Sequence, residues 1–523
     1  MVDTTLFVAC AAVFLAATLY LGYLGYRQTK NADDFMIAGK RISPVVLALS
    51  YGAAFISTSA IVGFGGISAV YGTGLMWLTV LCILVGVIIA FVFFGRRIRR
   101  MGRKLGAMTF PDFLGKRFGS SFMQYASAAM IIVAMPLYCA AIIIGGANFI
   151  DVTFGIDRNV AILGFAAITA SYVIFGGLIA VMYTDAMQGA LMLVGLTILL
   201  VITLVSVGGP TQGFTALSEL SPQIPMGLQE AGLRSWTTMP ELGSSAWLTL
   251  VTTIVMGVGI GVLAQPQLTV RFLSAKDDRA INRAVAVGGP FMLLTTGVAF
   301  TVGPLTNVWF WNDRGQIALT AAGGDFDQII PLFINSATPE LFVAVFLIVL
   351  LAAAMSTLSS LFHTMGTTAG YDLYKHITKR DTPSRRIAQV GTLIMMIVSV
   401  ALALSMPMNI IARATAMFMG LCASAFLPSL VYALYGKRHS AFPASLSLAA
   451  GAISWFLWTV FVHKAEAEPL GISQMLFGRV TLLDAPFTVV DPLIIGLPIA
   501  TIALVMGLAI ERRADARVDA EAA

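Results

Sequence analysis

Long apolar runs, separated by short polar segments, fill the chain from end to end. Thirteen of these runs extend to about 20 residues or more, which an α-helix needs to cross a hydrocarbon core roughly 30 Å thick. The pattern predicts transmembrane helices near 4–26, 44–71, 75–98, 122–150, 158–180, 184–208, 245–270, 281–311, 338–375, 386–406, 409–436, 441–462 and 489–511. We therefore expect an all-α polytopic membrane protein that resides in a lipid bilayer.

The composition excludes a soluble globular protein. Of the 523 residues, 58% are hydrophobic and 11% are charged, against roughly 25% charged residues in soluble domains. The net charge of +6 does not indicate nucleic acid binding, because the basic residues lie in short loops, where they orient a membrane protein. We expect neither a nucleic-acid partner nor an obligate protein partner.

The basic residues also predict the orientation of the chain. When thirteen helices are threaded from an N-terminus outside, 26 of the 32 Lys and Arg residues fall in the loops and the tail placed inside. This asymmetry satisfies the positive-inside rule, and an even number of helices would spoil it. The sequence predicts a multi-pass protein of the plasma (inner) membrane, with the N-terminus outside and the C-terminus in the cytoplasm.

Two predicted helices carry small residues and breaks at related positions. The second helix contains the small-residue run from Gly52 to Gly66, and the seventh contains Gly257-Val258-Gly259-Ile260-Gly261 before Gln265-Pro266. Interrupted helices at corresponding positions of two five-helix halves are typical of inverted-repeat transporters, in which solute and ions bind near the membrane midplane. The alternative is that the small residues only allow tight helix packing.

Asp185 is one of the few ionisable residues predicted at membrane depth, where such residues are costly and usually functional. It lies at the start of the predicted sixth helix, near its cytoplasmic end. Its carboxylate is interpreted either as an N-cap that bonds free N–H groups or as the negatively charged ligand of a sodium ion. The residues alone leave both alternatives open.

Hydroxyl side chains line one face of the predicted ninth helix. Ser356, Ser359, Ser360 and His363 are three or four residues apart, so they share a helical face. Several hydroxyl oxygens favour binding of a small hard cation, whereas hydrogen bonding between helices is the ordinary alternative. His363 is interpreted as a structural interior histidine, with a proton relay as the alternative.

Arg413 lies a few residues into the predicted eleventh helix, near its outer end. It either reaches the external interface or faces a cavity and pairs with a substrate carboxylate. Enzymatic signatures such as a Walker loop, a His-Glu-x-x-His motif or a nucleophile elbow are absent from the sequence. We therefore expect transport rather than catalysis, and we assign no catalytic residue.

Short motifs spread along the chain match one known family. They are Ala32-Asp33-Asp34-Phe35-Met36-Ile37-Ala38-Gly39, Thr109-Phe110-Pro111-Asp112-Phe113-Leu114, Phe175-Gly176-Gly177, Asp185-x-x-Gln188-Gly189, Gln265-Pro266-x-x-x-x-Arg271-Phe272, Met355-Ser356-Thr357 and Asp372-Leu373-Tyr374-Lys375. Over nearly its whole length the sequence resembles the sodium:solute symporter family, which includes sodium/proline, sodium/pantothenate, sodium/glucose and sialic acid carriers. The resemblance implies a LeuT-type core of five plus five inverted-repeat helices at 44–436, preceded by an extra helix and loop at 1–43. Two extra helices and a short tail follow at 437–523.

The resemblance also implies two sites for sodium ions. The first would use backbone carbonyls and hydroxyls where the first core helix unwinds, namely those of Ala53, Ile56, Ala353, Ser356 and Thr357. The second lies nearer the cytoplasm in some members, and its matching residues are Asp185, Ser356, Ser359 and Ser360. This match favours ion binding over capping for Asp185, and we expect two sodium ions per transport cycle.

The solute is predicted from the residues at the breaks. Proline carriers of the family place aromatic residues in the first and sixth core helices, where this chain has Ser59, Val258 and Val262, which disfavours proline and sugars. A small apolar pocket with Arg413 nearby favours a short monocarboxylate. The run that begins at Asp185 is similar to the pantothenate carriers, so pantothenate is the second choice. The predicted solute-binding residues are Ser57, Ser59, Val258, Val262 and Arg413.

The sequence thus predicts a sodium-coupled symporter that imports a small organic solute by alternating access. One rival is a proton-coupled carrier, in which Asp185 and His363 would form the relay. Another is a sensor or a channel built on the same fold. A channel requires a continuous polar path, and the few polar residues within the predicted helices argue against it.

Overall fold

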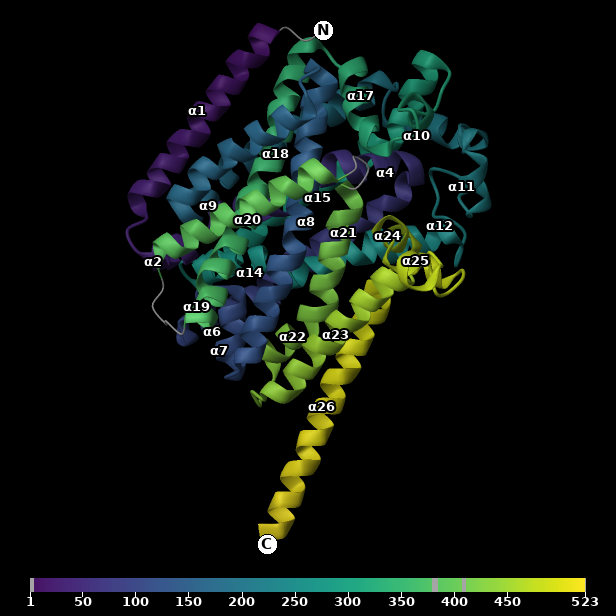
Figure 1. Ribbon diagram of the computed structural model, residues 1–523. Helices are drawn as coiled ribbons and strands as arrows, with labels where there is room; N and C mark the ends of the chain where they lie inside the picture. Colours follow the sequence, from purple (N-terminus) through teal and green to yellow (C-terminus); the bar gives the residue numbers. More distant parts are fainter. Residues whose placement is uncertain (1–3, 379–383, 407–410, 523) are drawn as a thin grey trace.

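The protein folds into a bundle of helices, shown as a computed structural model in Figure 1. The structure describes residues 4–378, 384–406 and 411–522. Within these residues the secondary structure is helical, apart from an isolated bridge between Ile42 and Ala275. Eleven helices are long and apolar enough to cross a membrane, which confirms the predicted all-α class.

The helices follow one another along the whole described chain. In the first half they are α1 (Thr4–Gln28), α2 (Ala32–Ile37), α3 (Pro44–Phe55), α4 (Phe64–Tyr71), α5 (Met76–Leu81), α6 (Arg96–Leu105), α7 (Phe110–Phe118), α8 (Ser121–Phe154), α9 (Arg158–Ser206), α10 (Pro210–Glu219), α11 (Met226–Glu230) and α12 (Ser245–Leu248). In the second half they are α13 (Gly259–Gly261), α14 (Pro266–Ser274), α15 (Asp278–Arg314), α16 (Ala318–Ala321), α17 (Ile329–Ala337), α18 (Glu340–Thr367), α19 (Tyr374–Thr378), α20 (Arg385–Ser405), α21 (Ile411–Leu421), α22 (Leu427–Tyr435), α23 (Ala441–Phe461), α24 (Lys464–Leu470), α25 (Ile472–Phe477) and α26 (Pro492–Ala522). Short tighter or wider helical segments join them, among them η2 (Ser59–Gly63), η3 (Gly72–Leu75), η4 (Cys82–Gly95), η6 (Thr249–Val258), η7 (Val262–Ala264), η9 (Thr368–Leu373), η10 (Cys422–Phe426) and η11 (Phe487–Val489).

Two of the eleven long helical stretches are too long for a single crossing. Ser59–Leu105 has 47 residues and Arg158–Ser206 has 49, whereas roughly 20 residues span the hydrocarbon core. Each stretch contains a glycine that leaves helical geometry at positive φ, Gly72 at 76° and Gly177 at 59°, a conformation that glycine adopts most easily. Dividing both stretches there would give thirteen crossings. The number thirteen stays a prediction, as do the boundaries of the core.

The predicted break in the second membrane helix is confirmed. α3 ends at Phe55, and helical structure resumes in η2 and α4. Ile56 is extended, with φ −87° and ψ 95°, so the chain leaves the helix in the middle of an apolar run. Gly52 allows the approach of α15, because a Cβ atom there would lie 2.4 Å from the Phe291 ring.

A second break lies at Gln265, within the predicted interruption of the seventh membrane helix. Gln265 is extended, with φ −67° and ψ 123°, and α14 begins with Pro266. Proline disfavours helical geometry in the residue before it and lacks the N–H group that would continue the helix. α14 is therefore a separate short helix beyond the break.

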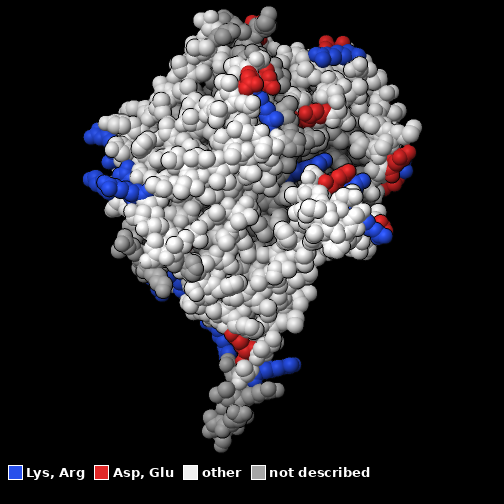
Figure 2. Space-filling view, viewed as in Figure 1, with Lys and Arg blue, Asp and Glu red and all other residues white. Residues whose placement is uncertain are grey.

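The two broken helices lie in the interior of the bundle: the first packs against α9 and α18 through α3, and the second contacts α18 through α14. α18 packs against α9, α8 and α3 and is buried along most of its length, whereas α1 and α26 are largely exposed. α26 extends beyond the bundle to the C-terminus (Figure 1). Figure 2 shows charged side chains in a few clusters with broad uncharged areas between them, as helices in contact with lipid require.

Candidate ion and solute sites

The residues of the first predicted sodium site meet where the break after α3 faces α18. The Ala53 carbonyl, in the last turn of α3, accepts hydrogen bonds from the hydroxyls of Ser356 at 2.9 Å and Thr357 at 3.4 Å. The Ser356 hydroxyl also lies 3.0 Å from the Ala353 carbonyl. Ile56 follows three residues after Ala53, at the extended turn. The structure thus brings the predicted residues together around the break.

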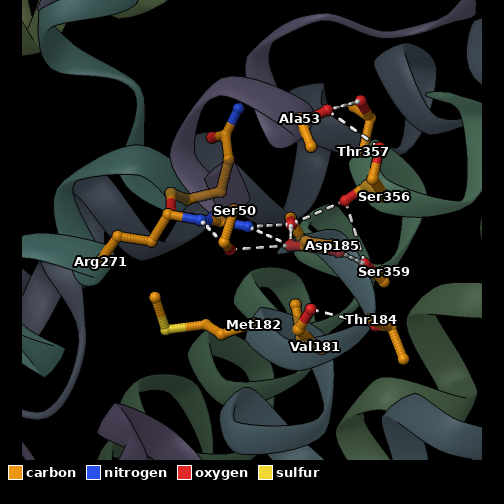
Figure 3. Close-up of polar contacts among 12 residues, drawn as sticks. Ser50, Ala53, Val181, Met182, Thr184, Asp185, Arg271, Ser356, Thr357 and Ser359 are labelled. Carbon is orange, nitrogen blue, oxygen red and sulfur yellow. Dashed lines mark hydrogen bonds and ion pairs between the residues drawn. The ribbon is translucent and has the colours of Figure 1, made fainter. Parts of the chain in front are cut away.

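Asp185 lies at the centre of a buried polar cluster (Figure 3). Its carboxylate accepts hydrogen bonds from the hydroxyls of Ser50 at 3.1 Å, Ser359 at 2.9 Å and Ser360 at 3.2 Å. An ion pair joins Asp185 Oδ2 to Arg271 Nη2 at 2.6 Å. None of these five side chains is exposed to solvent by more than 1%. The carboxylate of the second predicted sodium site therefore already has a cationic partner.

Ser356 connects the two predicted sodium sites. Its hydroxyl lies against the Ala53 carbonyl, while its own carbonyl accepts hydrogen bonds from Ser359 at 3.0 Å and Ser360 at 2.9 Å. A continuous ladder of polar groups therefore runs along α18 from the break to Asp185. Ordinary hydrogen bonding between helices would produce the same contacts, so the ion-binding roles of these residues stay predictions.

Asp185 does not cap a helix, so one of its two sequence interpretations is wrong. α9 is helical on both sides of Asp185, and the residue that leaves helical geometry is Gly177. Asp185 is therefore about two turns into the helical segment, beyond the reach of its free N–H groups. The predicted helix start at 184 is wrong, because the chain bends at Gly177, where glycine readily adopts a positive φ.

Arg271 is the candidate that the sequence analysis missed. With the predicted helix ending at 270, Arg271 counts as one of the orienting loop charges, but α14 continues to Ser274 and buries it. Its Nε donates to the Ser50 hydroxyl at 3.1 Å and its Nη1 to the Gln267 carbonyl at 2.8 Å, while its Nη2 also contacts the Ser360 hydroxyl. The signal was the apolar sequence Phe272-Leu273 directly after it, which continues the helix.

Gln188 is a second buried residue that the sequence motifs contain but to which no role was assigned from the sequence. It lies one turn after Asp185 in α9, and neither its Oε1 nor its Nε2 forms a well-aligned hydrogen bond among the described residues, although the Tyr172 hydroxyl lies beside it. The neighbouring Gly189 borders the first predicted sodium site, since a Cβ atom there would lie 3.2 Å from that of Ala53. Buried polar groups are rarely left unpaired. Gln188 is therefore a candidate to contact an ion between the two predicted sites.

His363 packs as an interior histidine. Its Nε2 lies 2.8 Å from the Phe35 carbonyl in α2, and the two rings are 5.6 Å apart. The serines of α18 face Asp185, whereas no hydrogen bond joins His363 to that cluster among the contacts described. This arrangement favours the structural interpretation of His363 over the relay.

Two of the predicted solute-binding residues line a central cavity between the broken helices. Ser57 and Val258 form part of its wall, together with Phe55, Phe64 and Phe300. Its volume is about 20 Å³, which is close to the space that one water molecule occupies. In this conformation the cavity is therefore closed around a space smaller than an organic solute.

Ser59 and Val262 lie close to this cavity but outside its wall. The Ser59 hydroxyl accepts a hydrogen bond from Thr415 at 3.0 Å, and Val262 packs against Gly86. Both side chains are almost fully buried. The five predicted solute-binding residues do not converge on one pocket.

Arg413 lines a different and larger cavity of about 590 Å³. The wall of this outer cavity includes Tyr71 at the end of α4, and His463, Lys464 and Glu466 in and before α24. Arg413 lines this cavity and is also exposed, so both interpretations of Arg413 stay predictions. Phe64 lines both cavities and thus lies between them.

The outer cavity is bordered by acidic and histidine side chains outside the membrane-spanning helices. His463 Nδ1 contacts Glu466 Oε2. Burial alone would lower the pKa of His463, but the charge and hydrogen bond of Glu466 raise it above its ordinary value. Asp491, just before α26, accepts a hydrogen bond from the Leu493 N–H at 2.8 Å, and burial raises its pKa to about 6 although His463 opposes this.

The sequence matches one family model and many curated transporters. The model of the sodium:solute symporter family matches residues 35–451. The osmoregulated proline transporter OpuE of Bacillus subtilis (strain 168) is 27% identical over 484 residues, which cover 90% of this chain and 92% of that protein. The sodium/proline symporter of Escherichia coli (strain K12) is 26% identical over 455 residues, which cover 86% of this chain and 87% of that one.

Solved structures of transporters resemble the whole described bundle. A Na+-coupled sialic acid symporter, in a substrate-bound outward-open state, has a TM-score of 0.73 at 18% identity, and the match covers 96% of both chains. Mhp1, a nucleobase-cation-symport-1 family transporter in a closed conformation, has a TM-score of 0.53 at 12% identity, with 91% of this chain and 95% of that one covered. These likenesses confirm the predicted LeuT-like transporter fold.

Proposed function

This chain belongs to the sodium:solute symporter family, and we propose that it uses the sodium gradient to import a small amino acid, proline, by alternating access. The observation that carries the proposal is the meeting of the α3 break with the hydroxyl face of α18 at Ala53, Ser356 and Thr357. Carbonyl and hydroxyl oxygens at a helix break are the ligands that sodium uses in transporters with broken helices. The named relatives are transporters, so we propose no enzymatic activity.

The first sodium ion binds at this break. The carbonyls of Ala53, Ile56 and Ala353 and the hydroxyls of Ser356 and Thr357 are its proposed ligands. Without an ion the two hydroxyls donate to the carbonyl of Ala53. With an ion, they turn their lone pairs toward it, because a hydroxyl both donates and accepts. Asp185, Ser356, Ser359 and Ser360 stay the proposed residues of a second site.

Proline replaces the solutes that the sequence analysis preferred. The short monocarboxylate and pantothenate are not supported, since the relatives reported above are proline carriers by name. The argument against proline relied on missing aromatic residues at Ser59, Val258 and Val262. The central cavity nevertheless has aromatic walls, because other positions supply them.

The lining of the central cavity suits a small amino acid with an apolar ring. Phe55, Phe64 and Phe300 offer apolar faces, while Ser57 and Thr296 offer hydroxyls. No Asp, Glu, Lys, Arg or His belongs to the wall within the described part of the chain. The free N–H groups and carbonyls at the helix breaks would therefore receive the carboxylate and the ammonium of the zwitterion.

Transport follows when the broken helices expose the cavity to one side and then to the other. We propose that the ten-helix core at 44–436 does this, with the N-terminus outside, the C-terminus in the cytoplasm and the outer cavity at Arg413 as the external approach. Proline carries no net charge at neutral pH, so each sodium ion moves one positive charge. At 100 mV this supplies about 2.3 kcal/mol per ion.

Uptake of radiolabelled proline into proteoliposomes tests the proposal. We expect accumulation with an inward sodium gradient, none with potassium, and inhibition by excess unlabelled proline but not by pyruvate or pantothenate. Uptake driven by a pH step in sodium-free buffer would support proton coupling instead. Saturable sodium-driven uptake of pyruvate or pantothenate, without uptake of proline, would overturn the choice of solute and leave the coupling intact.

A further inference from the structure

Arg271 places a positive charge on the oxygens predicted to hold a second sodium ion. Its Nη2 lies 2.6 Å from Asp185 Oδ2 and also contacts the Ser360 hydroxyl. Asp185 and Ser360 belong to the four residues of the predicted second site. We infer that Arg271 is a tethered cation that competes with sodium for Asp185, so a second sodium ion binds only when the guanidinium withdraws. The inference rests on the proposed function, in which sodium is the coupling ion.

The charge balance of the cluster supports competition rather than joint binding. The groups that bond Asp185 within the described chain are three serine hydroxyls and one guanidinium. The buried cluster therefore holds one negative and one positive charge. A sodium ion added to this pair would leave an uncompensated positive charge in a site closed to water, which is strongly unfavourable. Exchange of the guanidinium for sodium keeps the balance.

The position of Arg271 on α14 gives it a route of withdrawal. α14 starts directly after the extended residue Gln265, and helical hydrogen bonding does not continue across the break. A tilt of α14 about Gln265 would carry Arg271 away from Asp185 without bending α9 or α18. The side chains of Gln265 and Gln267 are buried, and each keeps an atom without a hydrogen-bond partner. They offer polar groups beside the break.

Both broken helices supply a partner to Asp185. Ser50 lies on α3, before the first break, and Arg271 lies on α14, after the second. Figure 3 shows the Arg271 side chain extending to Asp185 past Ser50. Binding of sodium at Asp185 would therefore depend on the position of α14. In this way Arg271 couples binding of the second ion to the movement of the broken helix. Arg271 acts here on the occupancy of the cation site without itself binding the ion.

A sodium titration of the purified full-length chain, without solute, tests the competition. The readout is the rise in unfolding temperature with sodium at constant ionic strength, with potassium as the replacement. R271Q removes the charge and keeps a polar side chain. If the arginine-paired conformation makes up about nine-tenths of the wild type, R271Q raises the apparent sodium affinity about tenfold. An unchanged or lower affinity in R271Q would overturn the inference.

Two control variants separate competition from general disturbance. R271K keeps a cation, so its apparent sodium affinity is expected between those of the wild type and R271Q. D185N/R271Q is neutral and lacks the carboxylate, so it should retain sodium binding at the first site and lose the gain of R271Q. If R271K binds sodium as tightly as R271Q, the charge is not the competitor.

Hydrogen exchange of the wild type tests the withdrawal even if R271Q does not fold. Sodium should speed exchange of the amides in α14, and this effect should be absent in D185N/R271Q. Exchange in α14 that slows or stays constant with sodium would contradict the inference. A wild type that does not respond to sodium in any of these measurements would instead contradict the proposed function, since the first site would also be inactive.

Discussion

Two groups of charged side chains lie inside the helical bundle or at its mouth, and they differ in their access to solvent. The inner group is the Asp185 and Arg271 pair, buried among serine hydroxyls. The outer group is Arg413, His463 and Glu466, which line a cavity of about 590 Å³. Arg413 is exposed there. The inner charges depend on one another for their stability, whereas water and salt can compensate the exposed Arg413, and the buried His463 and Glu466 pair with each other at the wall of the outer cavity.

The difference indicates separate tasks along one route. A closed site with fixed oxygens selects a small cation, because each ligand lost leaves a buried charge without compensation. An open cavity with several charges of both signs attracts a polar solute but binds it weakly. Under the proposed function, the inner group would select the ion and the outer group would receive the solute. The following changes test whether this division holds.

The largest effect is expected when one member of the inner pair is removed. D185N leaves the Arg271 guanidinium buried without its counter-charge, which costs about 3–5 kcal/mol. We expect D185N to lower the unfolding temperature in potassium strongly, or to prevent purification. In D185N/R271Q most of the loss should be regained because the cluster is then neutral. A double variant as unstable as the single one would show that the two charges are not coupled.

The next largest effect concerns the proposed first sodium site. Replacing Ser356 and Thr357 together by alanine removes two ion ligands but only neutral hydrogen bonds, three contacts shared by two hydroxyl protons, and such bonds are worth about 1 kcal/mol each. We expect sodium-dependent uptake to be abolished while the unfolding temperature in potassium changes little. T367A is the matched control, because the hydrogen bonds of the Thr367 hydroxyl to described residues go to carbonyls of its own helix. Unaltered sodium dependence in S356A/T357A would remove the site from the mechanism.

At Gln188 we expect a smaller effect, in which a substitution raises the stability of the fold instead of lowering it. Its amide forms no well-aligned hydrogen bond among the described residues, with the Tyr172 hydroxyl as its polar neighbour, so Q188M removes a buried polar group at little cost in bonds and should raise stability by about 1 kcal/mol in potassium. Sodium-driven uptake should slow if the amide contacts a passing ion. Q124M is the comparison, because Gln124 donates to Asp372 at 2.8 Å and should lose stability. A destabilised Q188M with normal uptake would contradict both expectations.

The helical class, both broken helices and the family could be predicted from the sequence because they depend on local patterns. Apolar length predicts a spanning helix, and Pro266 after Gln265 predicts where it stops. The family motifs identified the hydroxyls of Ser356 and Thr357, because these two residues are adjacent in the chain. These features need no knowledge of what packs against them.

The parts that failed depend on contacts between distant segments. The burial of Arg271 is decided by Asp185 and Ser50, which are far from it in sequence. The aromatic wall of the central cavity comes from positions such as Phe55 and Phe300, which only the packing of α3 and α15 brings together. Arg413 could be placed near the outer end of its helix, but the C-terminal segment that faces it could not.

The smallest effect is a pH dependence of the outer group. The pKa of His463 is raised in the folded state. The charged histidine therefore stabilises the fold fully below the ordinary pKa of histidine, and this stabilisation is lost as the pH rises through the raised pKa of the folded state. Asp491 acts in the same direction, since its pKa is raised to about 6. Between pH 5 and pH 8 the unfolding temperature of the wild type should therefore fall more than that of H463Q, by about 1–2 °C.

Glu466 supports the charged histidine, while Arg413 opposes it. E466Q should consequently reduce the same pH dependence, whereas H439Q, which removes a histidine that contacts Arg117 elsewhere, serves as the control. Equal pH profiles for the wild type, H463Q and E466Q would show that the outer charges are as independent of one another as those of an ordinary solvated surface, and the contrast with the inner pair would then be complete.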